Sequence, residues 1–333
     1  MRRTRASSGA ATGPAAGLPD LTARIGRLVL PNPVMTASGT AGHGVERAAY
    51  FDLSQLGAVV VKSLSCEPWP GNPPPRVHEA RAGMLNSVGL QNPGVDGWLD
   101  DDLPALAAAG ARVVASIWGF TADDYGQAAK ALAAAAANGK GGADAMIAIE
   151  ANISCPNIED GQRMFAQSRS ATGAAIEAAR GALVGSGLPL WAKLSPSVTD
   201  ITEIAGAALK AGAEGLTLVN TLMALALDPA TGRPRLGGGG GGLSGPALHP
   251  VAVRAVYECR QAFPDTAIVG VGGVTTAEDA AEFIAAGADA IQVGTATFTD
   301  PRAPARILAE LSRWCQCHHV SRLADLKVTD HDD

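Results

Sequence analysis

The stretch AMIAIEANISCPN, residues 145–157, decides the predicted fold, because a short apolar run ends there in a polar turn. The run from Ala145 to Ala151 has the length and composition of a buried strand. The turn that follows places Cys155 between Ser154 and Pro156. Barrels of parallel strands carry reacting groups just past the carboxyl ends of their strands. Cys155 is therefore the first candidate for a catalytic side chain.

A packing role is the alternative for Cys155, since free cysteine is among the most buried residue types. Its position in a polar turn, outside the apolar run, weighs against burial for packing. The residues alone leave both interpretations open.

The same unit recurs from Leu21 onward: a short apolar run, a polar or glycine-containing loop, then an alanine-rich segment with helical spacing. This alternation predicts parallel strands joined by crossover helices. Eight such runs fit a closed (β/α)8 TIM barrel with long rim loops better than an open doubly wound sheet, which usually has about six strands. The predicted strands are Val34–Ala37, Ala58–Val61, Val113–Ser116, Ala145–Ala151, Leu190–Lys193, Gly215–Val219, Ala267–Val271 and Ala290–Val293.

Polar and glycine residues follow most of these runs, at the end of the barrel where active sites are built. The last two loops, Gly270–Val274 and Gly294–Thr295, each precede a predicted helix. Backbone N–H groups beside helix N-termini bind phosphate, so these loops predict a phosphate site. The alternative is that their glycines only allow tight turns.

Two lysines, Lys62 and Lys193, end predicted buried strands. An ammonium group in a barrel mouth is costly unless an anion or a polarised ring meets it. A flavin offers a phosphate and a ring edge that becomes negative on reduction, which a lysine would stabilise. The alternative is an ion pair with a structural carboxylate.

Two further loops are expected at the rim. Residues 66–92 are rich in proline and end in MLNSVGLQN, whose amides and exposed backbone suit a planar ligand with carbonyl, N–H and carboxylate groups. Residues 237–242 are successive glycines. Ordering them costs about 1 to 2 kcal/mol per residue, so a mobile loop is predicted unless a ligand or partner holds it.

Composition excludes several classes of protein. The chain has 333 residues, 47% of them hydrophobic, and a formal net charge of -6, which offers no basic surface for nucleic acid or anionic lipid. No suitable apolar run exists outside alanine-rich, charge-flanked helices, so no membrane span is predicted. Five scattered cysteines are too few for a disulfide framework and favour a reducing cytoplasm.

The chain is expected to have three parts. Residues 1–20 are small, polar and basic, which is typical of a disordered tail; an export or transit signal is the weaker interpretation because no apolar region follows. Residues 21–312 form the barrel, and residues 313–333 a C-terminal tail. No metal is predicted, since the one candidate cluster in that tail is too crowded for a good zinc motif: Cys315, Cys317, His318 and His319.

A series of motifs follows in order over residues 21–311: ASGT, VVVKS, NSVGLQNPG, NISCPN, KLSP, VNT, LSGPALHP, GVGGV and VGT. Together they resemble the class 1 dihydroorotate dehydrogenases, most closely the NAD-linked catalytic subunits of the 1B branch. GVGGV or VGT alone would be a weak signal. The resemblance implies an FMN-binding barrel that oxidises (S)-dihydroorotate to orotate in pyrimidine biosynthesis.

The resemblance also implies residue roles. Cys155 would be the general base that takes the C5 proton while hydride leaves C6 for flavin N5; class 2 relatives have serine there. An unperturbed thiol is mostly protonated at neutral pH, so it needs help from Lys62 or a rim loop. Residues implied to surround the substrate are Lys62, Asn86, Ser87, Val88, Gly89, Leu90, Asn152, Asn220 and Thr221. Those implied to hold FMN are Ser38, Lys62, Ser63, Asn152, Lys193, Val219, Gly245, Gly272, Gly273, Gly294 and Thr295.

Two residues depart from the family pattern. Ser116 and Ser197 stand where relatives commonly place asparagine. Their shorter hydroxyls are expected to reach the flavin through water or to lose the contact.

The electron acceptor is not evident from the chain, which has neither iron–sulfur ligand spacing nor a convincing dinucleotide fingerprint. The 1B resemblance implies a partner subunit carrying FAD and a 2Fe-2S cluster; otherwise fumarate or a quinone would accept electrons directly. The resemblance also implies a homodimer. Two alternatives stay open: a flavoprotein acting on dihydrouracil-type rings, and a non-catalytic barrel that binds flavin or phosphate.

Overall fold

The computed structural model describes residues 18–154, 156–157 and 163–327. Eight parallel strands form one sheet in the order β3-β16-β15-β12-β11-β8-β7-β4. A bridge between Met35 and Ala58 joins its two ends, so the sheet closes into a barrel. The predicted (β/α)8 barrel is confirmed, with small differences at strand ends. The strands are β3 (Val34–Thr36), β4 (Val59–Val60), β7 (Val113–Ile117), β8 (Met146–Asn152), β11 (Leu190–Leu194), β12 (Gly215–Leu218), β15 (Ala267–Val271) and β16 (Ala290–Val293).

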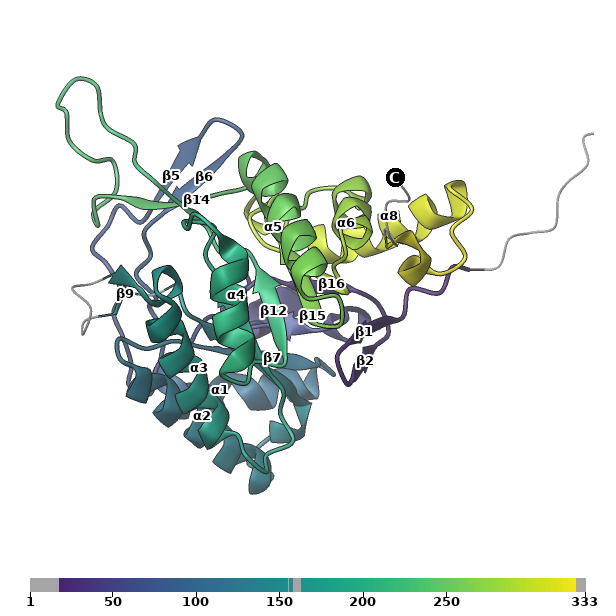
Figure 1. The fold of residues 1–333 in the computed structure, drawn as a ribbon, viewed down its shortest axis with the longest axis horizontal. Coiled ribbons are helices and arrows are strands. Elements are labelled where there is room, and N and C mark those ends of the chain that lie inside the picture. Colours follow the sequence, from purple (N-terminus) through teal and green to yellow (C-terminus); the bar gives the residue numbers. More distant parts are fainter. Residues whose placement is uncertain (1–17, 155, 158–162, 328–333) are drawn as a thin grey trace, which may run out of the picture.

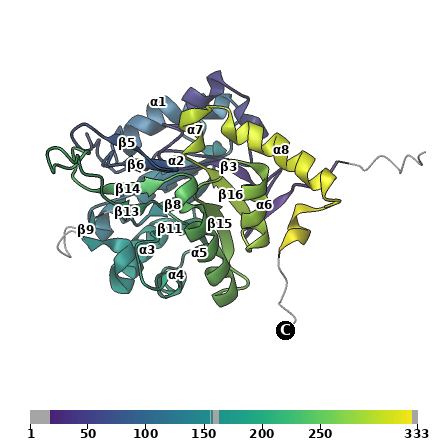
Figure 2. The same ribbon diagram turned by 90° about the horizontal axis from the view of Figure 1, so that it is seen from above.

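Helices surround these strands, as Figure 2 shows from above. The first crossover, from β3 to β4, contains only short 3-10 helices, Val45–Ala49 and Leu53–Gln55. Val45–Ala49 buries no residue, so it lacks the apolar face that packs a crossover helix on a barrel. The α-helices are α1 (Gly94–Ala108), α2 (Ala122–Ala137), α3 (Arg169–Ala182), α4 (Ile201–Lys210), α5 (His249–Ala262), α6 (Ala277–Ala285), α7 (Ala296–Thr299) and α8 (Ala303–Cys317).

Helix starts and buried faces follow from local sequence. α2 begins at a capping box between Thr121 and Asp124, in which each side chain accepts a backbone N–H of the other residue. α6 has the same arrangement at Thr276 and Asp279. The buried face of α3 consists of residues three and four positions apart, so one side of the helix packs inward: Thr172, Ala175, Ile176 and Ala179.

The interior of the barrel is packed with side chains, including Met35, Val114 and Trp191. A hairpin of β1 (Ala23–Ile25) and β2 (Leu28–Leu30) contributes Ile25 and Leu30 to the same cluster. These apolar contacts close the amino-terminal end of the barrel, which leaves the carboxyl end for a ligand.

Two rim loops meet in a second, antiparallel sheet of order β13-β14-β6-β5. The strands β5 (Val77–Ala80) and β6 (Gly83–Asn86) come from the loop after β4, whereas β13 (Leu222–Ala224) and β14 (Gly241–Ser244) come from the loop after β12. Figure 1 shows β5, β6 and β14 together at the upper left, away from the β1–β2 hairpin. A short pair, β9 (Pro156–Asn157) and β10 (Arg163–Met164), follows β8.

The glycine run differs from the predicted mobile loop. Gly241 and Gly242 belong to β14, which pairs with β6 and β13. A Cβ at Gly242 would lie 1.9 Å from Thr221 Oγ1, and a Cβ at Gly241 would lie 2.5 Å from the Asn86 carbonyl oxygen. For Gly241 and Gly242 the prediction is corrected: these two glycines allow close approach of other chain segments, and sheet hydrogen bonds hold them in place.

The predicted start of the C-terminal tail at residue 313 also differs from the structure. Helix α8 crosses the expected boundary at residue 312, with Cys315 buried, and Leu323 is buried farther along. The Asp20 backbone N–H donates to the Ser321 carbonyl at 2.9 Å, so the first described residues are joined to this segment. Residues 1–17 and 328–333 of the two predicted tails lie outside the described residues. Within the described ranges, no helix is both long and apolar enough to cross a membrane.

Candidate active site

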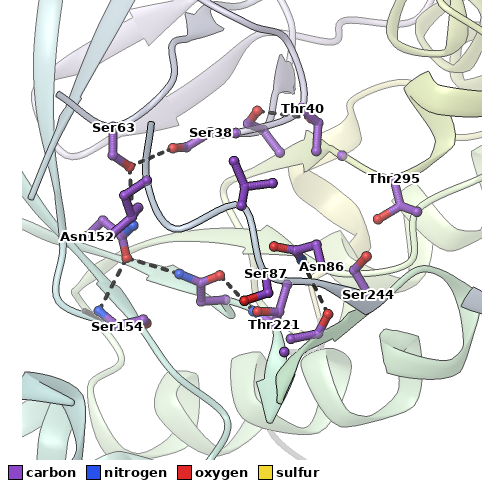
Figure 3. A pocket seen from close by; sticks show the side chains of 18 of the residues that line it. Ser38, Thr40, Ser63, Asn86, Ser87, Asn152, Ser154, Thr221, Ser244 and Thr295 are labelled. Atoms are coloured by element: carbon purple, nitrogen blue, oxygen red, sulfur yellow. Dashed lines mark hydrogen bonds between the residues drawn. The ribbon is translucent and has the colours of Figure 1, made fainter. Parts of the chain in front are cut away.

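A cavity of about 590 Å³ lies where the barrel strands end beside the rim sheet (Figure 3). Its size is in the range of small-molecule sites. All the residues predicted to surround substrate or FMN line this cavity. Cys155 lies outside the described residues, but its neighbour in sequence, Ser154, is in the lining. The structure therefore brings the predicted set together, while the individual roles stay predictions.

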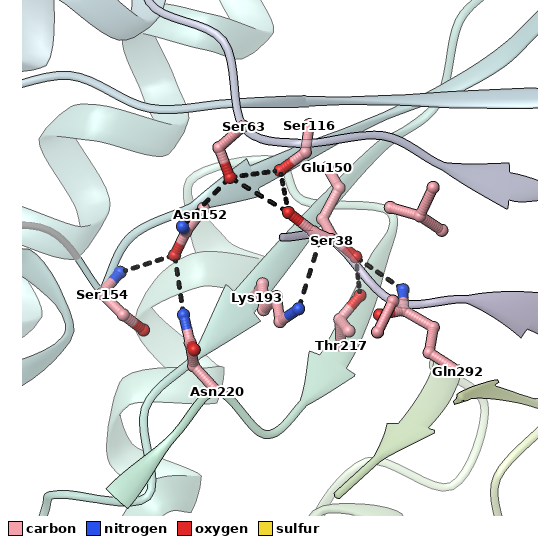
Figure 4. A network of polar contacts seen from close by, with 12 residues as sticks. Ser38, Ser63, Ser116, Glu150, Asn152, Ser154, Lys193, Thr217, Asn220 and Gln292 are labelled. Carbon is pink, nitrogen blue, oxygen red and sulfur yellow. Dashed lines mark hydrogen bonds and ion pairs between the residues drawn. The ribbon is translucent and has the colours of Figure 1, made fainter. Parts of the chain in front are cut away.

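A polar network crosses one wall of the cavity (Figure 4). Ser63 Oγ lies 3.1 Å from Ser38 Oγ and accepts from Asn152 Nδ2 at 3.2 Å. Asn152 Oδ1 accepts from Asn220 Nδ2 at 3.0 Å and from the Ser154 backbone N–H at 3.2 Å. These bonds fix the orientation of both amides, so they are ordered before a ligand arrives.

Ser116 and Ser197 bond to protein groups. Ser116 is fully buried, and its Oγ lies 2.9 Å from Ser63 Oγ and 3.3 Å from Ser38 Oγ. Ser197 Oγ accepts from the Met223 backbone N–H at 3.1 Å. Neither serine is part of the cavity lining found among the described residues. Ser116 instead supports two hydroxyls that do line it.

Lys193 meets a carboxylate that the sequence analysis did not single out. Its Nζ lies 3.8 Å from Glu150 Oε1, and both side chains are almost completely buried. Glu150 Oε2 accepts from Thr217 Oγ1 at 3.0 Å and from Gln292 Nε2 at 2.8 Å, while Oε1 has no hydrogen bond among the described residues. The structural ion pair considered for this lysine is present, and Lys193 also lines the cavity. The sequence signal for this ion pair was Glu150, a charged residue inside the otherwise apolar strand β8.

Gly245, Gly272 and Gly273 pack closely together in the cavity wall, and we call these three residues the glycine cradle. A Cβ on Gly273 would lie 2.8 Å from the Gly245 carbonyl oxygen, and a Cβ on Gly272 would lie 2.7 Å from Ala252 Cβ. The φ angles are positive, 144° at Gly272 and 70° at Gly273, which favours glycine at both positions. Helices α5 and α6 begin beside this cradle, so their N-termini add positive potential for an anion.

The loop over the cavity is held by several side chains. Asn86 ends β6, and its Nδ2 donates to the Gly242 carbonyl at 3.3 Å. Asn72 Nδ2 donates to Ser87 Oγ at 2.9 Å, and Trp69 Nε1 donates to the Gly89 carbonyl at 2.9 Å. Other residues that line the cavity were not singled out from the sequence: Trp69, Asn72, Met84, Trp118, Phe120, Gln167 and Phe298.

Comparisons with known proteins agree with this architecture. The family model for dihydroorotate dehydrogenase matches residues 20–314. A dihydroorotate dehydrogenase B (NAD(+)) catalytic subunit from Desulforudis audaxviator is 48% identical over 307 residues, which is 92% of this chain and 96% of the relative. The same-named subunit from Geobacillus kaustophilus is 46% identical over 284 residues, 85% and 87% of the two chains. A putative dihydroorotate dehydrogenase A (fumarate) from Solibacter usitatus is 45% identical over 311 residues, 93% and 98% of the two chains.

Proposed function

Since the chain belongs to the dihydroorotate dehydrogenase family, we propose that it oxidises (S)-dihydroorotate to orotate in pyrimidine biosynthesis, with FMN as its cofactor. The observation that carries the proposal is one cavity lined by an amide cluster, two lysines and a glycine cradle. Dihydroorotate is a small ring with amide groups and a carboxylate, which are the groups that such side chains bind.

The cavity residues fit FMN. The cradle at Gly245, Gly272 and Gly273 has no room for side chains and suits a phosphate. The buried Lys193 ammonium lies 3.8 Å from its carboxylate partner, a distance longer than a normal hydrogen bond, so its donors remain suited to a flavin ring edge. Bound FMN would accept the hydride that leaves C6 of the substrate.

The chain's own residues orient the substrate and take its proton. We assign the ring amides to Asn86, Asn152 and Asn220, and the carboxylate to Lys62. Amides already fixed by a network need little reorganisation, which favours a reactive geometry. Cys155 is assigned as the base that removes the C5 proton, and this role rests on its sequence motif.

For the electron acceptor we propose the NAD-linked route, in which a partner subunit carrying FAD and a 2Fe-2S cluster receives electrons from this chain. Support comes from the names of relatives such as those from Desulforudis audaxviator and Geobacillus kaustophilus. The Solibacter usitatus relative is named for fumarate instead. We also propose a homodimer and a cytoplasmic location. Co-purification of the partner, or acceptor activity with fumarate alone, distinguishes the two routes.

The proposed reaction is tested by comparing turnover of dihydroorotate with that of dihydrouracil, which lacks the carboxylate. We expect orotate formation and much slower reaction of dihydrouracil. At equal FMN content, Lys62→Met should raise the KM for dihydroorotate but leave the KM for dihydrouracil nearly unchanged. Preferred turnover of dihydrouracil would contradict the substrate assignment, and flavin binding without either reaction would favour a non-catalytic barrel.

A further inference from the structure

His249, the first residue of α5, lies directly behind the glycine cradle. Its Nδ1 is 2.9 Å from the Gly272 carbonyl oxygen, and its Nε2 is 2.9 Å from Glu282 Oε2 and 3.9 Å from Asp279 Oδ1. The ring packs edge-on against Phe283, with 5.0 Å between the ring centroids. Only 12% of the side chain is exposed, so its two bonding directions are fixed by protein groups.

Both ring nitrogens of His249 face hydrogen-bond acceptors. A backbone carbonyl and an ionised carboxylate cannot donate, so each nitrogen needs its own proton to make these bonds. A neutral ring would turn a lone pair toward either Gly272 or Glu282. The bond to Glu282 is charge-assisted when the ring is protonated, which makes it stronger than a neutral bond. The geometry therefore suits a ring that donates from both nitrogens.

The ring is coupled to the cradle by close packing. A Cβ on Gly273 would lie 2.8 Å from His249 Cβ and 3.0 Å from its backbone nitrogen. Gly272 and Gly273 line the cavity, whereas His249 does not belong to the lining found among the described residues. His249 thus acts on a ligand only through the loop that it holds.

We infer that His249 is a positioning residue of the phosphate site: when protonated, it holds the Gly272 carbonyl on the side away from the cavity and adds positive charge behind the loop. This inference rests on the proposed function, because it assigns the phosphate to FMN. Holding the carbonyl there leaves the N–H groups of the cradle for the phosphate oxygens. Loss of the ring proton removes one of the two bonds and the charge.

Carboxylates from α6 stabilise the protonated form. A cation at the N-terminus of α5 is opposed by the helix dipole, so it needs anionic partners. Glu282 and Asp279 are those partners. Burial raises the pKa of the Asp279 carboxyl, but hydrogen bonds from Thr275 and Thr276 and the nearby His249 together bring it below its ordinary value, so Asp279 is ionised.

The test measures the dissociation constants of FMN and of riboflavin, which lacks the phosphate, for the apoprotein by quenching of flavin fluorescence across a pH series. His249→Ala should weaken FMN binding about tenfold at the acidic end of the series, the loss expected for one charge-assisted hydrogen bond. Riboflavin binding should stay unchanged. His249→Asn keeps a donor for Gly272 without the charge, and it should lie between wild type and His249→Ala.

The pH profile separates this role from simple packing. The advantage of wild type over His249→Asn should shrink as pH rises, because the ring loses its charge while the amide does not titrate. Titration of the phosphate of free FMN affects both measurements equally and cancels in the ratio. Equal FMN affinity of wild type and His249→Ala, or equal loss for riboflavin, would overturn the inference while leaving FMN binding itself intact; a wild type that does not bind FMN would overturn the proposed function as well.

Discussion

Glu150 and Lys193 face each other inside the barrel, with 3.8 Å between Oε1 and Nζ. The other carboxylate oxygen is held by Thr217 and Gln292, so the acid cannot turn away. The Lys193 side chain is consequently held in the wall of the cavity. Glu150 belongs to the packed interior of the barrel, whereas Lys193 lines the proposed flavin site.

Glu150→Gln should destabilise the fold by about 3 kcal/mol, because it leaves a buried ammonium without its carboxylate while an amide oxygen can still accept from Thr217 and Gln292. Urea unfolding measures the loss. The double variant with Lys193→Met should recover part of it, since no buried charge then remains. A loss within about 0.5 kcal/mol for Glu150→Gln would show that the pair has little energetic importance.

Gly242→Ala should impair the site, because the added Cβ would lie 1.9 Å from Thr221 Oγ1. We expect a higher KM for dihydroorotate together with lower stability. Gly173→Ala is the matched control: Gly173 lies inside α3 with nothing within 4 Å of the added Cβ, so it should stabilise the fold by about 0.5 to 1 kcal/mol. A Gly242→Ala protein with wild-type kinetics would mean that the rim sheet rearranges easily.

Cys155→Ala should slow flavin reduction by dihydroorotate at least about a hundredfold, the usual contribution of a general base. Its FMN content should match that of wild type. Cys155→Ser should keep more activity than Cys155→Ala at high pH, because a hydroxyl is a poor base until it is deprotonated. Rapid anaerobic mixing measures the rate; an unchanged rate for Cys155→Ala would remove Cys155 from the reaction.

Burial raises the pKa of the Cys259 thiol to about 12, with smaller contributions from Glu258 and Asp200. The folded pKa is above the unfolded value, so the stabilisation is complete below about pH 8.5 and is lost as pH rises toward about 12. The difference in unfolding free energy between wild type and Cys259→Ala should therefore change by up to about 1.4 kcal/mol per pH unit in that range. A difference that stays constant with pH would contradict the burial of this thiol.

The barrel was predictable because its signals are local. Each apolar run, such as Leu190–Lys193, is short and followed by a polar or glycine residue, and eight of them leave little choice of architecture. Asn220 followed from its position after a predicted strand, and Asn86 from its place in the long rim loop. Only the resemblance separated substrate residues from cofactor residues.

The remaining features depend on contacts between distant segments. In the sequence, Glu150 is a charged residue inside an apolar strand with no evident partner. Its partners Gln292 and Lys193 come from distant strands and lie beside it only in the folded barrel. The glycine run suggested mobility because its sequence does not show which residues pack against it. In the structure, a Cβ added at Gly238 would clash with Ser87, and a Cβ added at Gly242 would clash with Thr221. Residues 313–333 were predicted as a tail because they show little apolar pattern, whereas α8 continues to Cys317 and Leu323 farther along is buried.

Anaerobic titration of the purified, FMN-loaded chain with dihydroorotate tests the central claim most directly. We predict that the yellow flavin absorption bleaches and that orotate forms in an amount equal to the flavin reduced, without any partner subunit. A flavin that stays oxidised in excess dihydroorotate would contradict the account.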